Sequence, residues 1–298
     1  MTMTDNDSAP DFLTTREVAA LLRVRERKVY EMAAADQIPC RRVTGKLLFP
    51  RGAVEAWLAG PTDAPPERPA GEARPNVIAG SHDPLLDWAL REAKTGLATF
   101  FDGSLDGLSR MAAGEAAACG MHVFEAHNRW NVDHVHDSDA GRSCVLVEWA
   151  IRRQGLIIGK DVRIGGIGDL RGHRVALRQQ TAGSRLLFDH LLAEAGLNHS
   201  DLIIAPPTAR TETDAATLIT SGQADATLGL DTVARQFGLA FLPLVDERYD
   251  LLIDRRAYFE PPFQTLFAFC RSPAFTDKAE EMGGYDLSGH AGIRWNSP

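Results

Sequence analysis

The sequence predicts an α/β protein with a small N-terminal module and a much larger second domain, and three observations indicate this division. A stretch rich in proline at residues 61–75 separates two parts of opposite charge. Helical periodicity and one hairpin pattern precede it, whereas short apolar runs alternate with helical periodicity after it. We therefore expect a disordered tail over residues 1–10, a module over 11–60, a linker over 61–75 and a large domain over 76–298.

Size and composition exclude several classes of protein. The 298 residues, 44% of them apolar, suffice to fill the cores of two or three domains. Apolar runs such as residues 239–245 are far shorter than the roughly 20 residues that span a bilayer, and the polar N-terminus lacks a secretory signal. We expect a cytoplasmic protein with no membrane partner. Its four scattered cysteines argue against a zinc ribbon or a disulfide framework and indicate buried thiols.

The module begins with two short helices. Thr14 and Glu17 have the spacing of a capping box, which predicts a first helix that ends near residues 23–24. A second helix is expected over residues 25–35, with Val29, Met32 and Ala33 turned toward the first. Next, residues 40–43, a turn at 44–46 and residues 47–49 predict a β-hairpin, and Pro50 opens a third helix that runs through Leu58.

The charge of the module suits nucleic acid. Residues 11–60 hold nine basic and six acidic side chains, whereas the chain as a whole carries a net charge of −8. The acidic remainder repels phosphate, so we expect contact with double-stranded DNA to be confined to the module. The expected DNA contacts are those of the second helix, in the major groove, and of the hairpin, along the backbone: Arg25, Arg27, Lys28, Tyr30, Arg41, Arg42, Thr44 and Lys46.

The order helix, turn, helix, wing, helix closely resembles the excisionase/MerR-like winged helix-turn-helix family. The resemblance covers about 50 residues and is carried by the opening at residues 13–19, the basic hairpin and the segment at 53–58. It implies a DNA-binding transcriptional regulator. The other interpretation is a helical protein-interaction module with solvated surface arginines.

The large domain shows six short apolar runs between helical periodicities, at residues 76–79, 97–101, 122–125, 174–177, 202–205 and 226–229. Such alternation is typical of an α/β sheet built by crossover connections. In three places a strand leads through a Gly/Ser turn into a helix, at residues 79–84, 101–108 and 180–187. The N-terminus of a helix presents unpaired amides, so these turns are candidate anion sites at the carboxyl ends of strands.

Residues 76–285 resemble the periplasmic-binding-protein-like domain found fused to helix-turn-helix regulators and to some molybdopterin biosynthesis enzymes, and distantly molybdate-binding proteins. The resemblance is carried by motifs at residues 81–83, 103–108, 113–116, 152–156, 183–185, 221–226, 247–251 and 283–286. It implies a type II domain with lobe 1 at about 76–150 and 255–298 and lobe 2 at about 158–248. The ligand site it implies consists of Ser81, His82, Asp83, Gly103, Ser104, His122, Thr181, Gly183, Ser184, Arg185 and Tyr249.

Several of these residues have a structural interpretation as well. Thr181-Ala182-Gly183-Ser184-Arg185 departs from the family's usual Gly-Ser-Gly-Thr-Arg, which preserves an amide-rich turn but changes the hydroxyl donors. Arg185 is either a ligand clamp or a surface side chain, and His122 is either a ligand residue or a core histidine. The segment at residues 133–137 pairs two histidines with two aspartates, although a polar loop of this kind is more often solvated than metal-binding.

The chain shows no pattern of an enzyme. Ser104, His122 and Asp102 contain the groups of a catalytic triad, but Asp102 and Ser104 are too close in sequence to flank a histidine. The sequence also contains neither a nucleophile-elbow motif nor a phosphate-loop motif. We therefore expect no catalytic residues, no metal and no cofactor.

These observations predict a one-component regulator that senses a small anion. The ligand would close two lobes around crossing segments near residues 152–159 and 249–254 and change how a homodimer presents its winged helices to DNA. Molybdate, tungstate, a small carboxylate and a molecule related to the molybdenum cofactor are the expected effectors. The alternatives are an architectural DNA-binding protein whose large domain mediates oligomerisation, and an enzyme tethered to DNA.

Overall fold

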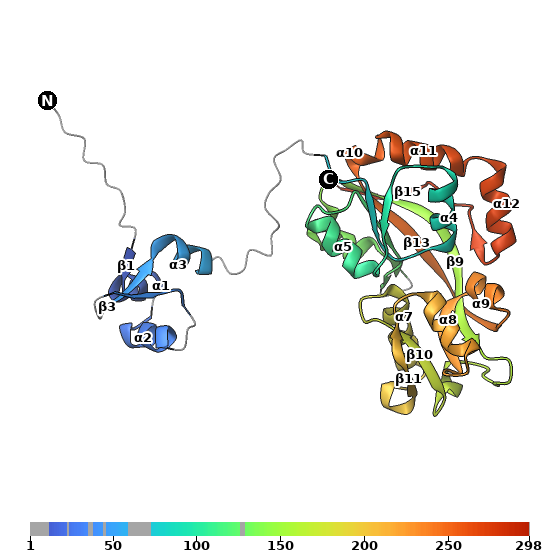
Figure 1. Ribbon diagram of the computed structural model, residues 1–298, viewed down its shortest axis with the longest axis horizontal. Helices are drawn as coiled ribbons and strands as arrows, with labels where there is room; N and C mark the ends of the chain where they lie inside the picture. The colour runs from blue at the N-terminus through green and yellow to red at the C-terminus, as the bar shows by residue number, and fades with distance from the viewer. Residues whose placement is uncertain are drawn as a thin grey trace. The chain divides into compact units, whose positions relative to one another are not determined.

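A computed structural model describes residues 12–22, 24–34, 38–43, 46–58, 73–125 and 129–297 of the chain (Figure 1). The chain divides into two compact units, Met1–Pro65 and Pro66–Pro298, which we describe separately.

The first unit is a small three-stranded sheet packed against helices. Its elements follow the order β1 (Phe12–Thr14), α1 (Thr15–Leu22), α2 (Glu26–Ala34), β2 (Arg41–Val43), β3 (Lys46–Pro50) and α3 (Arg51–Leu58). Strand β3 lies between β1 and β2, and Leu13, Val18, Val29, Phe49 and Val54 form the buried core. The predicted order of helices and hairpin is confirmed. Strand β1, which is three residues long, was not predicted because so short a segment shows no periodicity.

The predicted capping box is also confirmed. The backbone amide of Thr14 donates to Glu17 Oε2 at 2.7 Å, and the amide of Glu17 donates to Thr14 Oγ1 at 3.4 Å. These hydrogen bonds from Thr14 favour the charged carboxylate and lower the pKa of Glu17. Two otherwise unpaired amides at the start of α1 are thereby satisfied.

The second unit contains a ten-stranded sheet with two parallel halves, in which the short strands β14 (Tyr285–Asp286) and β15 (Ile293–Asn296) pair with β9 beside the main strand order. Lobe 1 contributes β4 (Val77–Gly80), β5 (Ala98–Phe100) and β6 (Ala118–Met121), and lobe 2 contributes β10 (Arg174–Arg178), β11 (Ile203–Ala209) and β12 (Ala226–Leu230). Two antiparallel strands, β9 (Cys144–Ile158) and β13 (Ala240–Asp254), join the halves in the order β11-β10-β12-β9-β13-β6-β4-β5.

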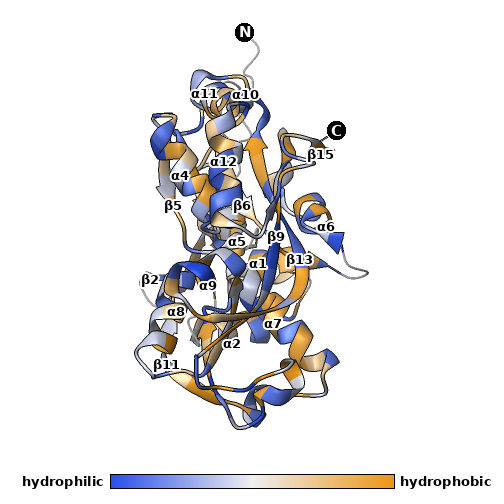
Figure 2. Ribbon diagram, turned by 90° about the vertical axis from the view of Figure 1, so that its right-hand side faces the viewer, coloured by the Kyte–Doolittle hydropathy of each residue, from blue (hydrophilic) through white to orange (hydrophobic). Residues whose placement is uncertain are grey.

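The two long strands run through both lobes (Figures 1 and 2). They pair from Cys144 with Asp254 at the lobe 1 end to Ile158 with Ala240 at the lobe 2 end. Each is 15 residues long, which corresponds to about 50 Å of extended chain. The sequence had indicated crossing segments only at residues 152–159 and 249–254, because polar residues interrupt the apolar pattern of both strands. We call β9 and β13 the hinge strands.

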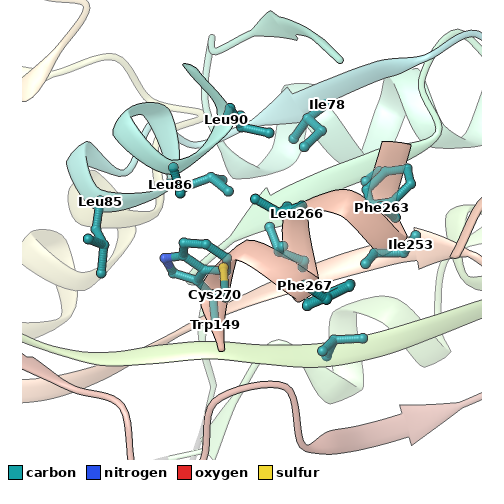
Figure 3. Packing of buried hydrophobic residues seen from close by; sticks show 14 of the residues in the cluster. Ile78, Leu85, Leu86, Leu90, Trp149, Ile253, Phe263, Leu266, Phe267 and Cys270 are labelled. Atoms are coloured by element: carbon teal, nitrogen blue, oxygen red, sulfur yellow. The ribbon is translucent and has the colours of Figure 1, made fainter. Parts of the chain in front are cut away.

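Helices cover both faces of the sheet in each lobe. Lobe 1 carries α4 (Pro84–Glu92), α5 (Ser104–Ala112), α10 (Arg255–Tyr258), α11 (Pro261–Cys270) and α12 (Pro273–Met282), and lobe 2 carries α7 (Gly183–Glu194), α8 (Glu212–Thr220) and α9 (Asp231–Phe237). The largest apolar cluster lies in lobe 1, where side chains of α4 and α11 pack around Trp149 and Ile253 of the hinge strands (Figure 3). A continuous apolar core therefore ties the hinge strands to lobe 1.

One predicted strand is wrong. The apolar run at residues 122–125 was expected to be a sheet strand, but the strand that pairs with β4 and β13 is β6, four residues earlier. The side chains of β6 are small, so the strand gave a weak sequence signal. Helix α5 crosses this strand so closely that a Cβ on Gly107 would lie 2.5 Å from Cys119 Sγ, which leaves no room for larger side chains. As a consequence, His122 is the first residue after β6, and Phe124–Glu125 forms β7, which pairs with β8 (Arg129–Trp130).

Candidate functional site

The outward surface of α2 carries two basic side chains, Arg27 and Lys28, together with Glu26 and Glu31. Arg27 and Lys28 expose 90% and 58% of their side chains, and both approach Glu31, at 3.1 Å and 3.9 Å. Tyr30 and Arg25 are exposed as well, whereas Val29 on the opposite face is fully buried. The helix and the residue just before it therefore expose four of the predicted DNA-contacting side chains to solvent.

The hairpin carries the other predicted DNA contacts. Arg41 is exposed on β2, and Val43 pairs with Lys46 at the end of the hairpin next to the turn. Arg42 and Lys46 belong to the paired strands, but their side chains, like the whole of Thr44, lie outside the described residues. The backbone geometry of a wing beside α2 is thus present.

In lobe 1, the strand-end turns meet at one buried point. Ser81 Oγ lies 2.9 Å from Ser104 Oγ, and the amide of His122 donates to Ser104 Oγ at 3.2 Å. Tyr249 of hinge strand β13 donates its phenol hydrogen to the carbonyl of Ser81. All four side chains are at most 5% exposed. The structure thus brings Ser81, Ser104, His122 and Tyr249 together at one buried point.

The turn before α7 of lobe 2 lies directly against this cluster. The amide of Leu105 donates to the carbonyl of Thr181 at 3.3 Å, and Thr181 Oγ1 donates to Asp106 Oδ2 at 2.6 Å. A Cβ on Gly183 would lie 2.6 Å from the carbonyl oxygen of His122, and one on Gly103 would lie 3.0 Å from that of Thr181. The lobes therefore touch where the two Gly/Ser turns face each other.

Arg185 turns away from the opposite lobe. Its guanidinium donates to Asp189 Oδ1 at 2.9 Å and to the carbonyl of Arg178 at 3.2 Å, and both acceptors belong to lobe 2. In this arrangement Arg185 is a largely buried residue of α7, 14% exposed, that is paired one turn along its own helix.

Asp83 anchors a buried charge network instead of offering a free carboxylate. It caps α4 by accepting the amide of Leu86 at 2.7 Å, and it also accepts from Trp149 Nε1, Arg152 Nη1 and Tyr285 Oη at 2.9 to 3.1 Å. Arg152 of β9 also donates to Glu247 of β13, which in turn lies 2.8 Å from His122 Nδ1.

Burial and charge oppose each other within this network. Burial alone would raise the pKa of Glu247, but the positive charge of Arg152 and the contact with His122 outweigh it, so that the pKa is lowered. Burial alone would lower the pKa of Arg152, but the negative charges of Glu247 and Asp83 outweigh this effect and raise the pKa. The pair therefore stays ionised although both side chains are at most 1% exposed.

Four side chains near the junction of the lobes hold polar atoms without a hydrogen-bond partner among the described residues: Arg152 Nε, both amide atoms of Gln154, Ser184 Oγ and Glu212 Oε2. Each of these residues is at most 7% exposed. Buried polar groups are normally paired. Five further buried atoms without a partner among the described residues lie elsewhere in the second unit: Glu125 Oε2, Asp250 Oδ1, Arg255 Nε, Ser272 Oγ and His290 Nε2.

A groove opens beside this interior. Its volume is about 650 Å³, and its walls come from α4 and α12 of lobe 1 and from α8 and α9 of lobe 2. Among the predicted site residues His82 lines it, and its ring meets Phe101 edge to face with the ring centroids 5.5 Å apart. Trp88, Thr213 and Arg235 also line the groove, and none of them had been predicted as a site residue.

The sequence did not indicate Glu247, Gln154 or Glu212 as site residues, and it did not indicate that Arg152 would pair with the predicted site residue Asp83. Arg152 and Glu247 are 95 positions apart and meet only because β9 and β13 pair in register. The one available signal was the apolar run at residues 144–158, which is interrupted by polar residues at its centre. This pattern could not identify the residues with which those polar side chains pair.

The histidines of residues 133–137 have carboxylate partners. His134 Nδ1 lies 3.1 Å from Glu125 Oε1, and His136 Nδ1 lies 3.0 Å from Asp137 Oδ1. Among the residues that the structure describes, no group of three or more histidine, cysteine, aspartate or glutamate side chains could hold a metal ion. Likewise, no helix within the described ranges is long and apolar enough to cross a membrane.

Comparison with known families matches both parts of the chain. A model described as a PBP superfamily domain matches residues 88–271, and a helix-turn-helix domain model matches residues 12–61. Among curated proteins, the uncharacterized protein YvgK of Bacillus subtilis (strain 168) is 27% identical over 292 residues, covering 92% of this chain and 94% of that protein. An uncharacterized Clostridium pasteurianum protein from the 5′ region of a ferredoxin gene is 35% identical over 74 residues, covering 24% of this chain and 66% of its own.

A solved structure has the same fold. A protein described as a phosphate ABC transporter substrate-binding protein with bound phosphate, from Clostridium perfringens, superposes with a TM-score of 0.51 at 13% identity, covering 70% of this chain and 97% of that one. The likeness supports the two-lobed architecture that the sequence predicted.

Proposed function

Because this chain belongs to the PBP superfamily and carries a helix-turn-helix domain before its superfamily domain, we propose that it is a transcriptional regulator whose two-lobed domain senses a small anion. One observation carries the proposal: a helix-turn-helix domain that exposes Arg27 and Lys28 and a two-lobed ligand-binding fold occur in the same chain. The first unit would bind double-stranded DNA through Arg25, Arg27, Lys28, Tyr30 and the hairpin. We further propose that the protein acts in the cytoplasm, as a homodimer or larger homo-oligomer, and without catalysis.

The proposed effector site lies between the lobes. The hydroxyls of Ser81 and Ser104 and the N-terminus of α7 at Gly183 and Ser184 supply hydrogen-bond donors, and donors suit an anion. His122 adds a ring whose Nδ1 is held by Glu247. Molybdate and tungstate are candidate ligands together with other small anions, and the similar Clostridium perfringens structure holds phosphate.

Ligand binding would act on the hinge strands. Lobe contacts such as Arg210 Nη2 with Asp102 Oδ1, at 3.2 Å, and Gln179 Nε2 with the carbonyl of Asp102, at 2.7 Å, hold the lobes together. An anion that bridges the two lobes would stabilise the closed arrangement relative to an open one. The size of this shift equals the difference between its binding free energies for the two arrangements.

The test is to select fragments of double-stranded DNA that the full chain binds and to measure their affinity with and without molybdate, tungstate, phosphate and small carboxylates. We expect an anion that raises the melting temperature to change DNA affinity at least five-fold. Ser104→Ala should abolish the anion effect while leaving DNA affinity in the absence of anion unchanged.

An anion that stabilises the protein but never changes DNA affinity would refute regulation by ligand. In that case the architectural alternative, in which the large domain mediates oligomerisation, would be favoured.

A further inference from the structure

The groove between the lobes is much larger than an inorganic anion. Its volume is about 650 Å³, whereas a tetrahedral oxyanion fills on the order of 100 Å³, judged from the roughly 30 Å³ that one water occupies. Pockets for organic ligands range from about 300 to 1,000 Å³. Its walls belong to both lobes, so an occupant would contact both at once.

The walls favour a ligand whose part within the groove is planar and carries little charge. Trp88 lines the groove. The centroid of its ring lies 5.5 Å from that of Phe269, and Lys278 Nζ lies 6.0 Å from the centroid of the Trp88 ring. The cations of the groove already have carboxylate partners: Arg91 with Asp87 at 2.6 Å, Arg235 with Asp231 at 2.9 Å and Lys278 with Glu281 at 2.9 Å. Neutralised in this way, they attract a bare anion weakly, whereas an indole face favours a second ring.

The groove adjoins the buried interior through shared turns. His82 of the groove stands between Ser81 and Asp83, both buried, and Thr213 follows Glu212. Glu212 Oε1 lies 3.9 Å from Arg178 Nη1, and the charge of Glu212 is among those that raise the pKa of Arg152. Residues that line the groove are therefore consecutive in the chain with residues of the buried interior.

The unpaired interior atoms both donate and accept. Arg152 Nε and Gln154 Nε2 are donors, while Gln154 Oε1 and Glu212 Oε2 are acceptors. A fully deprotonated oxyanion can only accept, so it would leave the two acceptors unpaired in a buried place, which is unfavourable. A ligand with a hydrogen-bond donor would satisfy them.

We propose that the effector is an organic anion that carries a planar ring, which lies against Trp88, and a hydrogen-bond donor, which meets Gln154 or Glu212. This inference rests on the proposed function, since it names the class of anion that the two-lobed domain senses.

The experiment uses the full chain, isothermal titration calorimetry and matched probes. Phenylphosphonate differs from methylphosphonate by a ring, and anthranilate differs from benzoate by an amino donor; molybdate and phosphate represent bare oxyanions. We expect phenylphosphonate to bind at least ten-fold more tightly than methylphosphonate, and anthranilate at least three-fold more tightly than benzoate.

Variants separate ring recognition from folding. Trp88→Leu keeps apolar volume against Phe269 and should remove the advantage of phenylphosphonate while leaving the affinity for methylphosphonate unchanged. Trp88→Phe retains a ring and should restore most of that advantage. Glu212→Gln should reduce the advantage of anthranilate over benzoate.

The outcomes separate the two proposals. Tight binding of molybdate or phosphate, with no gain from a ring and no effect of Trp88→Leu, would overturn the inference and leave the proposed function standing. If none of the probes produced heat or raised the melting temperature, both proposals would fail.

Discussion

His122 Nδ1 lies 2.8 Å from Glu247 Oε2, and this contact joins the end of a lobe 1 strand to a hinge strand. Glu247 also holds Arg152, whose other partner, Asp83, caps α4. His122, whose amide donates to Ser104, is therefore connected through the carboxylate of Glu247 to both hinge strands, and Asp83 extends the network to α4. A ligand that moved His122 would disturb the charge network at the point where the lobes join.

Glu247→Gln should destabilise the protein strongly. Arg152 would keep Asp83 but lose one of its two carboxylates in a place where both partners are at most 1% exposed. Breaking a buried pair costs about 3–5 kcal/mol, and urea unfolding at pH 7 measures the loss. The control is Glu281→Gln, which removes a largely exposed partner of Lys278 and should cost less than about 1 kcal/mol. Equal midpoints for the two variants would contradict the role assigned to the network.

The same variant should show a defined dependence on pH. The pKa of Glu247 is lowered from its usual 4.5, so its ionised form stabilises the fold above that pH. This contribution is lost as the pH falls through the lowered value. The difference in free energy of unfolding between wild type and Glu247→Gln should therefore be constant from pH 7 to about 5 and shrink below 4.5. A difference that grew with acid would refute this sign.

Asp250 should have the opposite dependence. Burial raises its pKa from 3.8 to about 6, although a hydrogen bond of 2.7 Å from Asn131 favours the charged form. The folded state thus binds the proton more tightly, and stability falls as the pH rises from 3.8 to 6. Relative to Asp250→Asn, the wild type should lose up to about 3 kcal/mol between pH 4 and 7, measured by urea unfolding. Parallel pH profiles would show that the carboxyl titrates normally.

Gly183→Ala should hold the lobes apart. The added Cβ would lie 2.6 Å from the carbonyl oxygen of His122, closer than such atoms can approach. We expect a larger radius of gyration by small-angle X-ray scattering and a loss of about 1–3 kcal/mol of stability. Gly168→Ala is the matched control, because nothing lies within 4 Å of its added Cβ. Identical scattering curves for the two variants would mean that the lobes tolerate the methyl group.

Arg27→Ala should weaken DNA binding without affecting the ligand domain. Its side chain is 90% exposed on α2, and each lost phosphate contact lowers the slope of log affinity against log salt by about 1. Fluorescence anisotropy on a selected duplex at several salt concentrations measures this slope. Arg163→Ala removes an exposed arginine of the large domain and so gives the chain the same net charge as Arg27→Ala, but it should leave the slope unchanged. Equal losses for both variants would point to a general charge effect.

Much of the first unit and of the strand-end turns could be predicted from sequence alone. The capping box at Thr14, the stripe that buries Val18 and Val29, and the Gly/Ser turns at Ser81, Ser104 and Ser184 depend on interactions within a few residues. Local geometry determines these features, so a linear pattern is sufficient to identify them.

Only the tertiary structure decided which residues meet. Arg152 and Glu247 are 95 positions apart, the groove joins α4 and α12 to α8 and α9, and Arg185 could turn either toward the cleft or toward Asp189. These outcomes depend on the register of two 15-residue strands and on how closely α5 packs against β6. The sequence by itself determined the local elements and the charge of each part, whereas the pairing of distant strands determined the buried charge network and the groove, because no short-range pattern records such contacts.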